Sequence, residues 1–110
     1  MEINAVKEAQ KRLSCYLIYK KLVDSECAKE PIADEMALRA EMFAIRRSVM
    51  RLPDSKEKIF IYNRYIRGET MESCAELIGI SRRSVFRLSH LAMETYLRYN
   101  PKGEKTRVLS

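Results

Sequence analysis

Apolar residues in the first part of the chain recur at helical spacing. Residues 2–23 contain neither Gly nor Pro. Their apolar positions lie three, four or seven residues apart, at Ile3, Val6, Ala9, Leu13, Tyr16 and Val23. This spacing predicts one face of a long amphipathic helix. The following stretch, 24–32, contains Pro31 and breaks the pattern.

A second helix is predicted over about 33–51. One apolar stripe advances in alternating steps of four and three, through Leu38, Met42, Ile45, Val49 and Leu52. Such a rhythm suits a helix that packs lengthwise against another, so we expect residues 1–51 to form an antiparallel helical pair. Met36, Ala40, Phe43 and Met50 form a second stripe, which indicates contacts on two sides of this helix.

Helix-capping signals divide residues 52–100 into three further helices, at about 54–67, 71–78 and 82–98. The signals are Asp54 with Glu57 in a capping box, then Gly68, Thr70, Gly79, Ser81 and Asn100-Pro101. The polar residues that follow, 101–110, are expected to be a flexible tail. The sequence thus predicts an all-α fold, in which a helical pair precedes a three-helix unit.

The last two of these helices carry the spacing of a helix-turn-helix. Two crossing helices need a small residue where their backbones approach, a turn residue that tolerates positive φ, and an apolar inner set. Ala75 supplies the small residue, Gly79 the turn and Val85 an inner position ten residues after Ala75. The remaining inner positions are Cys74, Ile78, Ile80 and Leu88. An ordinary helical hairpin with a Gly turn is the alternative interpretation.

Cations gather at the start of the last helix. If Val85 and Leu88 face inward, Arg82, Arg83 and Arg87 lie on the outer side or its flanks. An Arg-rich first turn is unfavourable beside the positive end of the helix dipole, and becomes favourable when a polyanion lies opposite.

In a DNA-recognition helix, the N-terminal residues reach base edges and the flanking cations hold phosphates. We therefore expect Arg83 and Arg87, together with Ser84, to contact base edges in double-stranded DNA, and Ser81 and Arg82 to contact phosphates.

The sequence allows two interpretations of Phe86 and two of the cations on the preceding helix. Phe86 can touch a thymine methyl group or pack against a neighbouring helix. The cations of the preceding helix can contact the DNA backbone or form a solvated face; they are Lys56, Lys58, Arg64 and Arg67.

Length and composition limit the size, membrane contact and location that we expect for the protein. The 110 residues allow one small domain, and 21 Lys plus Arg against 15 Asp plus Glu give a net charge of +6. The longest apolar run is Cys15–Tyr19, which is too short to span a bilayer. With no signal-peptide pattern and three widely spaced cysteines, we expect a cytoplasmic protein with no membrane contact and no disulfide framework.

The residue inventory argues against an enzyme. His90 is the only histidine, and it has no Cys or Ser partner at a nucleophile spacing. Three thiols with one histidine make a poor zinc site, and no Gly-rich phosphate loop is present. We expect neither catalysis nor a metal or other cofactor.

From Leu52 onward the chain resembles region 4 of the bacterial sigma factors. The matching residues are Leu52-Pro53, Tyr65, Gly68, Ala75-Glu76-Leu77, Gly79-Ile80-Ser81 and Val85, and the resemblance extends to about Leu97. It implies that the last helix reads promoter DNA and that the module docks on RNA polymerase. By motif position, it places Arg82, Arg83, Ser84 and Arg87 toward DNA.

The chain departs from that family in its first half, because residues 1–51 do not resemble the region that binds the other promoter element. Its size and layout are more similar to small sigma-like regulators of phages and prophages of Gram-positive bacteria, including late-gene activators of the ArpU type. One helix-turn-helix binds weakly alone, so we expect the N-terminal helices to form a homodimer or to contact polymerase. The alternative is a phage assembly protein resembling terminase small subunits.

Overall fold

The computed structural model describes residues 3–26 and 35–101. Every regular element in these two ranges is helical, which confirms the all-α prediction for them. The predicted flexible tail, apart from Pro101, and most of the predicted break between the first two helices lie outside the described residues, as does Cys27.

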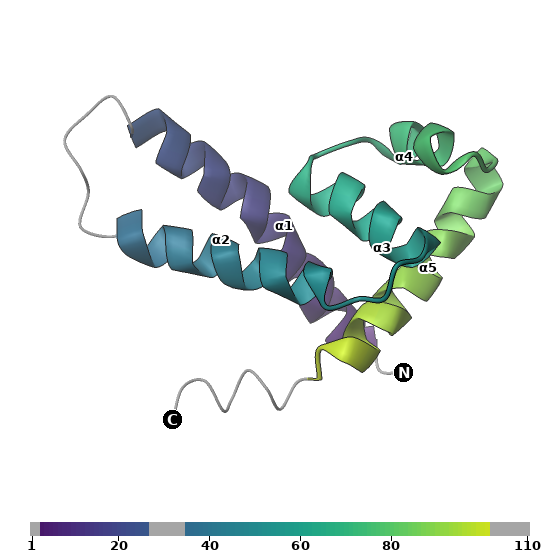
Figure 1. The fold of residues 1–110 in the computed structure, drawn as a ribbon, viewed down its shortest axis with the longest axis horizontal. Coiled ribbons are helices and arrows are strands. Elements are labelled where there is room, and N and C mark those ends of the chain that lie inside the picture. Colours follow the sequence, from purple (N-terminus) through teal and green to yellow (C-terminus); the bar gives the residue numbers. More distant parts are fainter. Residues whose placement is uncertain (1–2, 27–34, 102–110) are drawn as a thin grey trace.

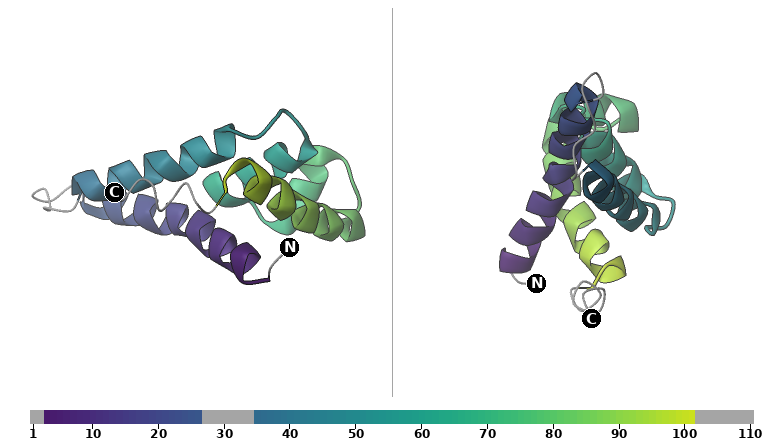
Figure 2. Two further views of the ribbon diagram at one scale, coloured as in Figure 1. Left: turned by 90° about the horizontal axis from the view of Figure 1, so that it is seen from below. Right: turned by 90° about the vertical axis from the view of Figure 1, so that its left-hand side faces the viewer.

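The first two helices lie side by side. Helix α1 (Ile3–Glu26) packs against α2 (Glu35–Met50), and the left view of Figure 2 shows the end of α1 beside the start of α2. The predicted inward stripe of α2 is correct in its centre, since Ile45 and Val49 are fully buried. The second stripe faces solvent: Met36 is 82% exposed and Phe43 62% exposed.

The second half contains α3 (Lys56–Ile61), a π-helical turn η1 (Tyr62–Ile66), α4 (Met71–Ile78) and α5 (Arg82–Tyr99). Both α3 and α4 pack against α5. The ends of α4 and α5 agree with the capping signals to within one residue. The start of α5 lies at the opposite end of the molecule from the end of α1 and the start of α2 (Figure 1).

The N-terminal cap of α3 differs from the prediction. The capping residue is Ser55, whose backbone is extended and whose Oγ accepts a hydrogen bond from the Lys58 N–H at 3.3 Å. The predicted Asp54–Glu57 capping box is wrong, because the helix begins one residue later than that box requires. Asp54 instead forms an i,i+4 ion pair with the Lys58 ammonium at 3.4 Å.

The body of this helix also differs from the prediction, which is a regular α-helix to about residue 67. After Ile61 the backbone widens into the π turn η1. The Arg67 N–H bonds to the Tyr62 carbonyl, five residues back, at 3.1 Å. Phe60 and Ile61 are buried, and the wider turn allows Ile66 to be buried as well. In a regular α-helix, the position four residues after Ile61 faces the same way, and here that position is Tyr65. The π turn instead brings Ile66, five residues after Ile61, to the core.

One core joins the two halves of the chain. The cluster of buried residues includes Leu13 and Tyr16 of α1 and Ile45 of α2, together with Phe60 and Met93 of the second half. Helix α1 also packs against α5 and η1. Helices α1 and α2 thus share one hydrophobic core with the elements of the second half.

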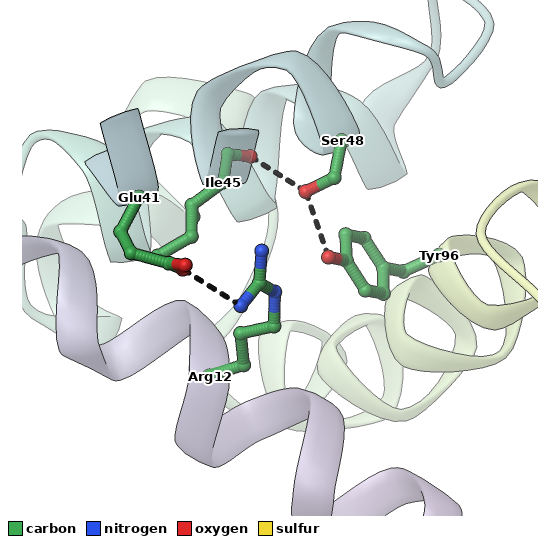
Figure 3. Close-up of polar contacts among 5 residues, drawn as sticks. All are labelled: Arg12, Glu41, Ile45, Ser48 and Tyr96. Atoms are coloured by element: carbon green, nitrogen blue, oxygen red, sulfur yellow. Dashed lines mark hydrogen bonds and ion pairs between the residues drawn. The ribbon is translucent and has the colours of Figure 1, made fainter. Parts of the chain in front are cut away.

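Hydrogen bonds also connect the C-terminal part of α5 to α2 (Figure 3). The Tyr96 hydroxyl donates to Ser48 Oγ at 2.7 Å, and Ser48 Oγ donates to the Ile45 carbonyl at 2.6 Å. The Asn100 amide donates to the Ser48 carbonyl at 3.0 Å. These bonds fix the C-terminal end of α5 against α2.

In the part of the chain that the structure covers, no helix combines the length and apolar character needed to cross a membrane.

Candidate nucleic-acid interface

The turn between α4 and α5 depends on a left-handed residue. Gly79 has φ +84° and ψ +37°, a conformation that a residue with a Cβ adopts only at a cost. Its N–H bonds to the Ala75 carbonyl at 2.8 Å, and the Ile80 N–H bonds to the same carbonyl at 3.0 Å. Two donors therefore satisfy the end of α4, and the chain turns directly into α5.

The predicted inner set packs where the two helices meet the core. Cys74 and Val85 are fully buried, and Ala75 and Leu88 are 6% and 8% exposed. Ile78 and Ile80 are half-buried and pack against the same cluster. Of the seven predicted positions, only the turn residue Gly79 is exposed.

Hydroxyl caps start both helices. Thr70 Oγ1 accepts from the Ser73 N–H at 3.0 Å, and Ser81 Oγ accepts from the Ser84 N–H at 3.1 Å. The Ser81 hydroxyl also donates to Ser84 Oγ at 3.0 Å. The two serines predicted to contact DNA are therefore engaged with each other at the start of α5, where they define its first turn.

The outward side of α5 carries the predicted arginines. Arg82, Arg83 and Arg87 are exposed, and Val85 and Leu88 are turned into the core. Arg83 and Arg87 are four residues apart, which places them about 40° apart around the helix and about 6 Å apart along its axis. Two guanidinium groups thus project from one face of the first two turns.

Arg82 has a partner that the sequence does not suggest. One of its guanidinium nitrogens lies 3.2 Å from a carboxylate oxygen of Glu72, in the first turn of α4. Both side chains are mostly exposed, at 73% and 61%, so the ion pair contributes little stability. The pair joins the starts of two helices ten residues apart in the chain, a separation for which no local spacing rule exists.

The other predicted cations are held by neighbours in their own segment. Lys58 pairs with Asp54, and Arg64 donates to the Glu69 carbonyl at 3.0 Å and lies over the Tyr65 ring. Arg67 lies 3.6 Å from the Glu69 carboxylate. Lys56 is exposed. Three of these four residues therefore help to shape the segment before α4, and their contact with DNA stays a prediction.

The buried ionisable groups near the turn are poorly suited to chemistry. Burial raises the pKa of the Cys74 thiol, which lowers the fraction of reactive thiolate at neutral pH. Burial likewise raises the pKa of Tyr65. Within residues 3–26 and 35–101, no three His, Cys, Asp or Glu side chains come together in a way that could hold a metal ion. The prominent chemistry of this surface is therefore its exposed positive charge.

Comparison with known protein families, with curated proteins and with solved structures yields no match to this chain.

Proposed function

We propose that this protein is a sequence-specific DNA-binding transcription regulator, similar to sigma factor region 4, which inserts α5 into the major groove. The observation that carries the proposal is the combination of exposed Arg82, Arg83 and Arg87 on the first two turns of α5 with the left-handed Gly79 turn before them. An α-helix fits the major groove, and Arg is the residue that most often reads guanine there.

The arginines have distinct roles in this proposal. Arg83 and Arg87, on the outward face, contact base edges. Arg82 contacts a phosphate, exchanging its exposed Glu72 partner for the DNA backbone. Ser81 and Ser84 contribute hydroxyl or backbone N–H groups at the start of the helix, where the dipole favours an anion.

A second contact is needed for useful affinity. A single helix-turn-helix buries roughly 600–1,000 Å², and its non-specific binding is weak at physiological salt. The N-terminal helices are the candidate for that contact, either with RNA polymerase or with a second copy of this chain. Their two most exposed large apolar side chains lie on α2, at Met36 and Phe43.

The test is a fluorescence-anisotropy titration of the full chain against a random DNA pool and against a site selected from it. We expect Arg83→Ala to lose about 5- to 150-fold in affinity for the selected site and little for the pool. We expect Arg82→Ala to weaken binding to both equally and to reduce the slope of log K against log salt by about 1.

Arg98→Ala is the matched control, since Arg98 is exposed on the same helix but lies about 22 Å from Arg83 along the axis. Its affinity should stay within about twofold of wild type. The proposal is wrong if the wild-type protein binds no DNA at low salt, or if Arg98→Ala weakens binding as much as Arg83→Ala.

One observation favours a second candidate, an assembly protein that uses the same fold. Met36 and Phe43 are strongly exposed on the face of α2 that points away from the core, and exposed apolar patches often mark protein contacts. Light scattering of the free protein separates the two functions. A closed ring favours assembly, and a monomer or dimer favours regulation.

A further inference from the structure

Phe86 is an exposed aromatic residue on the helix proposed to enter DNA. Its side chain is 50% exposed, although its neighbours Val85 and Leu88 are buried and Phe60 and Tyr96 show that rings are accommodated in this core at 1% and 4% exposure. A Phe side chain can bury on the order of 200 Å², so about half of that area faces water. The ring is therefore available to a ligand in the free protein.

Its neighbours on the surface are cations. Phe86 follows Arg82 by four residues and Arg83 by three, spacings that bring side chains together on a helix, and Arg87 is the next residue. An apolar ring that has exposed arginines three and four residues before it is suited to a partner that combines a negative charge with a small apolar group. Double-stranded DNA has this combination in its major groove, where the C5-methyl group of thymine lies between phosphate backbones.

The position of Phe86 on α5 specifies where such a thymine lies. Arg83 and Phe86 are about 4.5 Å apart along the helix axis and about 60° apart around it. In zinc-finger recognition helices, residues three apart contact successive bases. We propose that Phe86 contacts the C5-methyl group of a thymine in the base pair next to the guanine that Arg83 reads, an inference that rests on the proposed function.

The experiment removes only the methyl group. In the selected DNA site, each thymine in turn is replaced by deoxyuridine, which keeps the hydrogen-bonding pattern of thymine and lacks the methyl. Affinity of the full chain is measured by fluorescence anisotropy. We expect wild type to lose about fourfold at one thymine, the effect of withdrawing one buried methyl group. That thymine should neighbour the base pair at which Arg83→Ala relaxes specificity.

Two variants assign the effect to the ring. Phe86→Ala should bind the thymine and deoxyuridine sites equally, with an affinity about that of wild type for deoxyuridine. Tyr99→Ala is the matched control, because Tyr99 is also an exposed aromatic residue of α5, at 43%, but lies about 20 Å from Phe86 along the helix axis. It should keep the fourfold preference for thymine.

The outcomes separate the inference from the proposed function. If wild type binds no DNA, the proposed function fails. If wild type binds its site selectively but tolerates deoxyuridine at every thymine, the inference fails and the proposed function stands. The inference also fails if Phe86→Ala keeps the preference for thymine, and loss of polymerase binding in that variant would then assign the ring to a protein partner.

Discussion

Substitution of the turn residue before α5 has a predictable cost, because the two left-handed glycines among residues 3–26 and 35–101 differ in their surroundings. Gly79 has φ +84°, and a Cβ added there meets no heavy atom within 4 Å. Gly68 has φ +78°, and a Cβ there would lie 3.2 Å from Leu17 Cδ1 of α1. The change in stability of Gly79→Ala therefore reports the cost of the left-handed backbone alone. Gly68→Ala adds to this cost a tight contact with Leu17.

The cost of Gly79→Ala follows from two opposing terms. The left-handed conformation costs an L-residue about 1–2 kcal/mol, and the lower entropy of the unfolded Ala chain offsets about 0.4–1 kcal/mol. The net loss is about 1 kcal/mol, or a fall in Tm of roughly 5 °C. Gly79→Asn should lose less, because Asn enters this region routinely. Gly68→Ala should lose more than Gly79→Ala, and Leu17→Ala should reduce that difference in a double-mutant cycle.

Urea denaturation followed by circular dichroism at 222 nm gives the free energy of unfolding for each variant. The reasoning is refuted if Gly79→Ala is as stable as wild type, or if it loses more than Gly68→Ala. Either result would contradict the left-handed backbone of Gly79 or the open space around its Cβ position.

Two further predictions concern buried groups. Tyr96→Phe should lose about 1 kcal/mol of unfolding free energy, and a cycle with Ser48→Ala should give a coupling of about 1 kcal/mol because the hydroxyls bond directly at 2.7 Å; strictly additive losses in urea denaturation would contradict this. Cys74, with its raised pKa, binds its proton more tightly in the folded state than in the unfolded state. The resulting stability is therefore present at neutral pH and is lost as pH rises above about 8.5, by up to about 1.4 kcal/mol per pH unit. Denaturation curves between pH 8 and 10 should show this loss in wild type and not in Cys74→Ala, and equal slopes in the two proteins would rule it out.

The geometry of α4, the Gly79 turn and the start of α5 was largely predictable because its determinants are close together in the chain. Ala75, Gly79 and Val85 set the close approach, the turn and the inner contact within eleven residues. Thr70 and Ser81 cap their helices as their position before an amphipathic run predicts. Such features depend on local sterics and on backbone hydrogen bonds within a few residues, which sequence patterns record directly.

The structural features that residue spacing did not predict depend on contacts with residues outside the local segment. The choice of Ser55 over Asp54 as a cap reflects where α3 begins, and its start follows from burying Phe60 and Ile61. The π turn places Ile66 in the core, at a position that a regular helix would give to Tyr65. Glu72 meets Arg82 only because the two helices start next to each other.

The local pattern of the sequence thus determines most of the helices, the ends of α4 and α5, the turn at Gly79 and the arginines of α5. The tertiary structure decided that α1 and α2 share one core with the C-terminal helices, through Leu13, Ile45 and Met93. It also decided that Phe86 stays half-exposed beside the arginines and is not packed away. The physical reason is that helix formation and capping depend on residues close together in the sequence. Burial depends on which helix surfaces pack together, and residues far apart in the sequence determine this packing.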